Sequence, residues 1–188
     1  MNRHPSSVPG RIPRAIKALT VLGAATAMFV FAPRDARAQE EGDSAAMSAN
    51  RGLKIGIGPT ILFPMRENGP YGGGLDLEGR YGIKAGPTVL APGGLLGGYL
   101  ISSRFIGVAM PTFRVTLPVG PLAPYVLGGL GGGWISNPSE GGLAYLAGGG
   151  MMIHFGRIVA IGAELSYRKI TNTEFGGWAL GPAISFGG

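Results

Sequence analysis

Apolar and polar residues alternate with a period of two in several parts of the chain. Residues 75–81 run Leu-Asp-Leu-Glu-Gly-Arg-Tyr, and residues 161–168 run Ile-Gly-Ala-Glu-Leu-Ser-Tyr-Arg. Residues 113–117 and 178–186 follow the same pattern. Because successive side chains of a strand point to opposite faces, each run has one apolar face and one polar or small face. This period predicts β-strands.

Eight segments rich in apolar residues alternate with clusters of Gly, Pro, Asn and Ser. Their spacing leaves about 17 residues for each strand and its turn, and a tilted strand that crosses a membrane needs about 9–11. The predicted strands are 53–63, 73–84, 88–100, 105–117, 123–135, 143–155, 157–170 and 177–186.

Eight apolar faces are more than the interior of one small soluble domain accepts. The pattern therefore predicts an all-β, eight-stranded antiparallel up-and-down transmembrane β-barrel, with apolar side chains facing lipid and small or polar ones in the lumen. The lumen of such a barrel is just wide enough for side chains to fill, so glycines are expected at inward positions. The aromatic residues near the predicted strand ends, which we expect at the membrane interface, are Tyr71, Tyr81, Tyr99, Phe105, Tyr125, Trp134, Tyr145, Phe155, Tyr167, Trp178 and Phe186.

Composition and charge narrow the function further. The chain has 188 residues, 36 of them Gly, and it has no Cys, which excludes disulfides, thiolate metal sites and a cysteine nucleophile. The net charge of +6 lies mainly in residues 1–38, which carry +5, so the remainder is nearly neutral. Since no basic patch with interleaved aromatic residues is present in the sequence, nucleic acid is not an expected partner.

The first 38 residues have the three parts of a secretory signal peptide. Four basic residues precede an apolar run at 18–32, and the small residues Ala36 and Ala38 precede Gln39. The apolar run is too short to span a bilayer, which takes about 20 residues. We therefore expect cleavage between Ala38 and Gln39, a flexible periplasmic N-terminal segment at 39–52, and an outer-membrane barrel domain at 53–188.

Three segments carry a resemblance to a known family. Residues 124–131 (Pro-Tyr-Val-Leu-Gly-Gly-Leu-Gly), the run 161–168 and the last strand, which ends in Phe186, resemble the small outer-membrane β-barrels of the OmpX and OmpA type. The resemblance covers nearly all of 53–188. It implies an integral protein of the Gram-negative outer membrane, surrounded by lipid and inserted by the barrel assembly machinery, and we expect a monomer. Family members usually end on an aromatic residue that this machinery reads, whereas Gly187 and Gly188 follow Phe186 here.

An even number of strands places both termini in the periplasm. The outer loops are then expected near 64–72, 101–104, 136–142 and 171–176, and the inner turns near 85–87, 118–122 and 156. All of these connections are short, which disfavours a protruding adhesin.

Charged residues at inward positions are the candidate functional group. Three acids and three bases can neutralise one another in a narrow, poorly hydrated lumen, where isolated charges are costly. We expect a plug of salt bridges, with a narrow ion-conducting path as the alternative, and we expect Arg80→Ala to destabilise the barrel. The six residues of this predicted lumen network are Asp76, Glu78, Arg80, Arg114, Glu164 and Arg168, with Lys54 placed below them.

Catalytic and cofactor chemistry is not indicated. Barrel esterases need a histidine beside a serine on the lipid-facing side, but His154, expected at the lumen mouth, has no serine within two residues. Single histidines and scattered carboxylates give no metal-ligand spacing. The glycine-rich residues 128–133 lack the Lys-Ser/Thr of a phosphate-binding loop. We therefore expect a structural or interaction role without catalysis, cofactor or metal.

Two other architectures remain open at this point. Residues 115–139 carry no charged side chain and show small-xxx-small spacing at Gly128 and Gly132, as in a helical membrane protein with a glycine zipper. Three prolines in the same region and the flanking period of two disfavour it. A secreted soluble barrel that binds an apolar ligand would need polar outward faces, which the fifth, sixth and eighth predicted strands lack.

Overall fold

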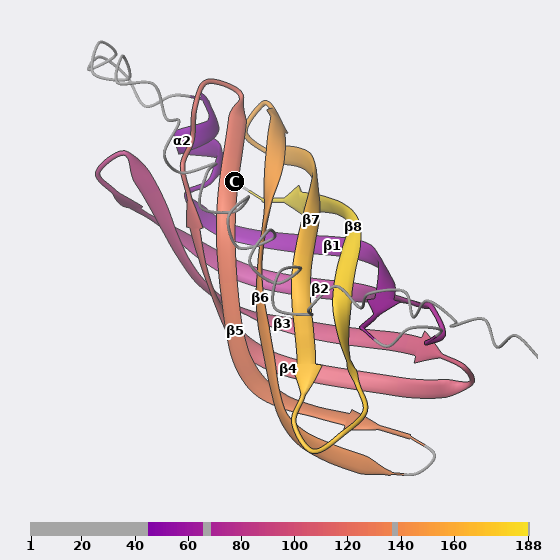
Figure 1. Cartoon of the computed structure of the whole chain (residues 1–188). Coiled ribbons are helices and arrows are strands. Elements are labelled where there is room, and N and C mark those ends of the chain that lie inside the picture. Colours follow the sequence, from indigo (N-terminus) through magenta and orange to yellow (C-terminus); the bar gives the residue numbers. More distant parts are fainter. Residues whose placement is uncertain (1–44, 66–68, 137–138, 188) are drawn as a thin grey trace, which may run out of the picture. The chain divides into compact units, whose positions relative to one another are not determined.

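The computed structural model describes residues 45–65, 69–136 and 139–187, and within them eight antiparallel strands close into a barrel (Figure 1). Each strand pairs with its neighbours in the sequence, and the last pairs with the first. The predicted up-and-down barrel is therefore confirmed. The predicted signal peptide and its cleavage site lie outside the described residues. The strands are β1 (Gly52–Pro64), β2 (Gly72–Ala85), β3 (Thr88–Ile101), β4 (Arg104–Thr116), β5 (Leu122–Ile135), β6 (Glu140–Phe155), β7 (Val159–Ile170) and β8 (Gly176–Phe186).

The predicted strand boundaries agree with these bounds to within three residues, the largest difference being the start of β6 at Glu140. The glycine-zipper alternative is wrong, because that segment forms the end of β4 and the whole of β5. No helix in the described part of the chain is long and apolar enough to cross a membrane.

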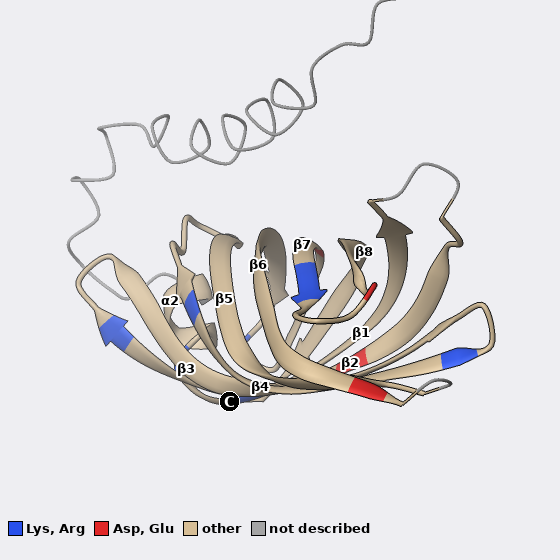
Figure 2. Ribbon diagram, turned by 60° about the horizontal axis from the view of Figure 1, so that its bottom comes forward, with Lys and Arg blue, Asp and Glu red and all other residues tan. Residues whose placement is uncertain are grey.

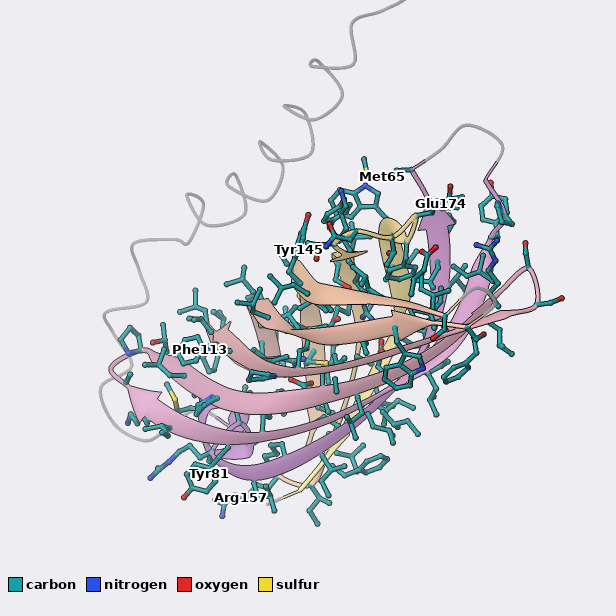
Figure 3. All side chains as sticks on the ribbon, turned by 90° about the horizontal axis from the view of Figure 1, so that it is seen from below. Met65, Tyr81, Phe113, Tyr145, Arg157 and Glu174 are labelled. Atoms are coloured by element: carbon teal, nitrogen blue, oxygen red, sulfur yellow. The ribbon has the colours of Figure 1, made fainter. Side chains whose placement is uncertain are left out.

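The two ends of the barrel are easily told apart. We call the end where β1 begins and β8 finishes the terminal end, and the opposite one the loop end. Figure 3 shows Tyr81 and Arg157 at the terminal end and Met65 and Glu174 at the loop end.

The outer surface of the barrel is apolar. Along each strand, exposed apolar side chains alternate with buried inward ones; on β2, for example, Tyr81 is 57% exposed and Arg80 only 5%. Phe113 and Tyr145 project outward from the ribbon (Figure 3). Lys, Arg, Asp and Glu mark only a few short segments of the chain (Figure 2). A surface of this kind fits lipid rather than water.

Outward aromatic rings gather near both ends of the barrel. The rings of Tyr145, Tyr167 and Trp178 form a row across β6, β7 and β8, with centroids 6.2 and 5.6 Å apart. Phe63 on β1 and Tyr71, just before β2, form a second ring pair, and Phe105 on β4 and Trp134 on β5 form a third. These rings lie at the loop end; Tyr81, Phe155 and Phe186 lie at the terminal end.

The distance between the two aromatic levels matches a bilayer. Eight to ten residues separate the levels along a strand, as from Trp178 to Phe186 on β8. At about 3.3 Å per residue and a tilt of about 35–45°, the levels are roughly 19–27 Å apart, close to the ~25 Å apolar band of such barrels. Two of the aromatic residues predicted at the interface are an exception: Tyr99 and Tyr125 point inward and are buried, so that prediction is wrong for them.

Inward glycines are needed for space, as the sequence predicts. A Cβ added at Gly93 or Gly162 would overlap a carbonyl oxygen of the neighbouring strand. At the outward Gly79 and Gly132, a Cβ would meet nothing within 4 Å. The strands of a small barrel curve tightly enough that many inward positions have no room for a side chain.

Both mouths of the lumen are closed by short segments of the chain. At the terminal end, helix α2 (Ala45–Ala49), within the segment expected to be flexible, buries Met47 and the following Asn50. At the loop end, Phe175 is 7% exposed and stacks on the Tyr99 ring with centroids 6.2 Å apart. The lumen is thus covered by side chains at each end.

Candidate functional site

The structure brings all six residues of the predicted lumen network together in the middle of the barrel. Asp76, Glu78 and Arg80 come from alternate positions of β2, so the period of two points all three inward. Arg114 reaches in from β4, and β7 contributes Glu164 and Arg168 from the opposite wall. Five of the six are 9% exposed or less, and the Glu164 side chain is 15% exposed.

One half of the network joins β2 to β7. The Nη1 group of Arg168 donates to Oδ1 of Asp76 at 2.8 Å, and its Nε donates to Ser166 at 3.0 Å. Asp76 also accepts hydrogen bonds from the hydroxyl of Tyr99 and, at 2.8 Å, from that of Thr60. Both carboxylate oxygens of Asp76 are therefore satisfied.

The other half joins β2 to β4 and β8. Oε2 of Glu78 accepts from Arg80 at 3.0 Å and from Arg114 at 2.7 Å. The second terminal nitrogen of Arg80 donates to the hydroxyl of Ser185 at 2.9 Å. Glu78 is thus held between two guanidinium groups on neighbouring parts of the wall.

Glu164 links the two halves. Its carboxylate lies 3.4 Å from Arg114 and 3.5 Å from Arg168, and it accepts a hydrogen bond from Tyr125 at 3.0 Å. The guanidinium of Arg114 also lies over the Tyr125 ring, 3.9 Å from its centroid, in a cation–π contact. One connected network therefore spans the lumen.

Several polar members of this network were missed by the sequence analysis. Tyr99 and Tyr125 were assigned to the membrane interface because aromatic residues favour it. Tyr99 and Tyr125 lie an even number of residues from the inward Leu95 and Leu127 on the same strands, and this spacing was the signal that places them in the lumen. The further members that the prediction left out are Thr60, Ser166 and Ser185.

Lys54 lies inward, as expected, but it is not bound to the carboxylates. Its ammonium group donates to the backbone oxygens of Gly187 and, at 3.4 Å, of Arg157. It therefore ties β1 to the chain end and to the turn before β7, at the terminal end of the barrel.

His154 lies at the lumen mouth at the end of β6. Its Nε2 is 3.1 Å from the side-chain nitrogen of Asn50, which also donates to the Ala46 carbonyl. The ring thus anchors α2, and its Nδ1 has no hydrogen-bond partner among the described residues. In the same part of the chain, no group of three His, Cys, Asp or Glu residues could hold a metal ion.

The electrostatics of the network follow from its composition. Three guanidinium groups and three carboxylates balance to zero net charge, which limits the cost of burying them. Each carboxylate is bound to at least one arginine, so removing one member leaves a charge uncompensated in a low-dielectric interior. Such a network fixes the relative positions of opposite walls of the barrel.

Comparison with known structures identifies the fold. The N-terminal β-barrel domain of Pseudomonas aeruginosa OprF aligns with a TM-score of 0.53 and 18% identity, over 71% of this chain and 95% of that one. The outer-membrane enzyme PagL aligns with a TM-score of 0.52 and 9% identity, over 70% and 97%. Neisserial surface protein A aligns with a TM-score of 0.51 and 9% identity, over 71% and 94%. No protein-family model and no curated protein matches the sequence.

The fold is therefore that of the small eight-stranded outer-membrane barrels, of the OmpX and OmpA type. At these identities the likeness concerns architecture only.

Proposed function

We propose that this chain is an integral outer-membrane protein with a structural or interaction role, without catalytic activity and with a closed lumen. One observation carries the proposal: a barrel with an apolar outer surface encloses a charge-balanced network that fills the lumen between two covered mouths. The apolar side chains belong in lipid, and the network replaces the water that a pore would contain.

The outer membrane is the location that best fits this architecture. Exposed apolar side chains such as Leu53, Leu96 and Leu130 are distributed over β1, β3 and β5 and would face water in a secreted barrel. The spacing of the aromatic levels supports a bilayer, and all three aligned structures are barrels with this fold. We propose that lipid surrounds a monomer and that the barrel assembly machinery inserts it.

A closed lumen is favoured over an ion-conducting path. The cavity beside the network has a volume of about 40 Å³, far smaller than a continuous water column. Phe175 and Tyr99 stack across one mouth, and α2 packs into the other. A hydrated ion would have to displace side chains at all three levels.

The proposed lack of catalysis rests on the surroundings of His154. The histidine is tied to Asn50 at the lumen mouth rather than paired with a serine hydroxyl on the lipid-facing surface. PagL is an enzyme, but its 9% identity carries nothing about activity to this chain.

Gel mobility and conductance test the proposal together. The protein comprising residues 39–188 should migrate differently in detergent gels before and after boiling, because a closed barrel resists mild detergent until it is heated. In planar bilayers it should show no channel openings. A mobility that boiling does not change would contradict the barrel, and regular conductance steps would replace the closed lumen with the pore alternative.

Variants that uncover the mouths test which level closes the lumen. One variant lacks residues 39–50 and therefore α2, and a second variant adds Phe175→Ala. Conductance in these variants would show that the mouths close the lumen, and no conductance would show that the charged network alone is sufficient to close it.

A further inference from the structure

The contact between β1 and β8 is interrupted at its centre. Pairing holds at Ile57 with Ile184 and again at Ile61 with Leu180, but residues 58–60 and 181–183 do not pair. Pro59 and Pro182 fall opposite each other in this stretch.

The two prolines explain the interruption. Pro59 remains paired with Leu75 on β2, and Pro182 remains paired with Ala163 on β7. The N–H groups that proline lacks are therefore those that would have crossed between β1 and β8. Two hydrogen bonds are lost at one place, and the carbonyl oxygens there have no N–H opposite them, which is costly inside a bilayer.

A cavity beside the charged network lies against this unpaired stretch of β1 and β8, which we call the seam. Its volume is about 40 Å³, and its lining includes Gly58, Gly181 and Ala183 together with all six charged residues. A Cβ at Gly56 or Gly58 would lie 3.4 or 3.1 Å from the nearest atom, whereas a Cβ at Gly181 would overlap the carbonyl oxygen of Pro59 across the seam. The wall between the cavity and the lipid is thus the unpaired backbone, with little side chain on its inner side.

Two buried polar atoms among the cavity-lining residues have no partner within the described protein. Oε1 of Glu78 is an unsatisfied acceptor, and Nε of Arg114 is an unsatisfied donor. Glu78 is 9% exposed and Arg114 is 3% exposed. Leaving a buried polar atom without a partner is costly, so both atoms call for a ligand that can donate and accept hydrogen bonds.

We propose that this cavity is a binding site for water in the middle of the membrane, and that the unpaired stretch of β1 and β8 is its lateral entrance. Water fits on three counts. The surrounding charges sum to zero, which disfavours an ion; the site requires both a donor and an acceptor; and 40 Å³ holds about three molecules at roughly 10–15 Å³ each. The unpaired carbonyl oxygens of the two prolines provide further acceptors along the entrance.

Hydrogen exchange of arginine side chains tests the site directly. In the folded protein, labelled with ¹⁵N-arginine, the Nε–H of Arg114 should exchange with D₂O at least tenfold faster than that of Arg168. The latter is equally buried but already donates to Ser166. Equal, slow exchange at both positions would overturn the water site, and this comparison needs no substitution.

The entrance is tested by restoring the missing N–H groups. The double variant Pro59→Val with Pro182→Val should slow exchange at Arg114 at least tenfold, while the gel shift on boiling is retained. Pro111→Val is the matched control, because that proline interrupts β4–β5 pairing but does not line the cavity; exchange should not change. If the double variant exchanges as fast as the parent, water enters along the barrel axis and the lateral entrance is wrong; the gel shift on boiling verifies that the variant measured is folded.

Discussion

Replacing Arg168 with methionine should be among the most damaging single changes in the lumen. Arg168 is the only arginine bound to Asp76 among the described residues, at 2.8 Å, and it also approaches Glu164. Methionine fills a similar volume without charge, so the variant isolates the loss of the ion pair. Asp76 would keep only the hydroxyls of Thr60 and Tyr99 as donors.

The size of the effect follows from burial. Removing one partner of a buried ion pair costs about 3–5 kcal/mol, because the other charge is left uncompensated. Since two hydroxyl donors remain on Asp76, we expect the lower end, about 3 kcal/mol. That corresponds to roughly a 150-fold change in the folding equilibrium constant.

Equilibrium urea unfolding of the protein in lipid vesicles measures this change. The chain has two tryptophans, Trp134 and Trp178, both on the outer face, and their fluorescence reports unfolding. Trp178 pairs with Tyr167, next to the substituted residue, whereas Trp134 lies on β5. Lys169→Met is the control, because it removes a charge from the next residue on β7, which points outward; it should shift stability by less than about 0.5 kcal/mol.

A double-mutant cycle separates the cost of leaving Asp76 without its ion-pair partner from the cost of altered packing. Asp76→Asn alone leaves Arg168 beside Glu164 and should cost about 1–2 kcal/mol. Combined with Arg168→Met, it removes both charges, so the double variant should cost about 2 kcal/mol less than the sum of the single changes. A loss below about 1 kcal/mol for Arg168→Met, or strict additivity, would refute the reasoning.

Three further predictions use the same unfolding assay or, for the last, solvent exchange. Arg80→Ala should destabilise the barrel by about 1–3 kcal/mol, less than Arg168→Met, because Glu78 keeps its contact with Arg114; a larger loss than for Arg168→Met would contradict the partner assignment. Gly93→Ala should lower the free energy of unfolding by about 1–3 kcal/mol, because its Cβ overlaps a backbone oxygen, whereas Gly79→Ala, on the lipid-facing side, should change it by less than about 0.5 kcal/mol. Equal stability of the two variants would contradict the lack of space at inward glycines. Phe175→Ala should uncover the loop end and increase solvent exchange of the Tyr99 hydroxyl, and an unchanged rate would show that the ring is not the cover.

Much of the fold could be predicted from the sequence, because β-strand periodicity is a local property. Alternation at residues 75–81 and 161–168 placed Asp76, Glu78, Arg80, Glu164 and Arg168 on inward faces, and the structure finds them there. Turn residues such as Gly86 and Gly156, both with positive φ, marked strand ends in the chain itself. Strand number, boundaries and the side each residue faces all follow from such short-range signals.

Which acidic side chain contacts which arginine in the network could not be predicted from the sequence. That Asp76 meets Arg168, 92 residues away, depends on the stagger of the strands around the closed barrel, which no local pattern specifies. Tyr99 and Tyr125 were misplaced because an average preference of aromatic residues outweighed their parity. Similarly, α2 and Phe175 cover the mouths only because closure brings distant segments to each end.

The interrupted seam shows the same division. The sequence by itself determined that residues 59 and 182 are prolines on outward positions of two strands, and hence that each lacks an N–H group. Only the tertiary structure decided that these two gaps face each other, because the register between the first and last strands is set by closure of the whole barrel. The sequence decides where an N–H group is missing, but only the closed barrel decides which residue of the neighbouring strand lies opposite that position.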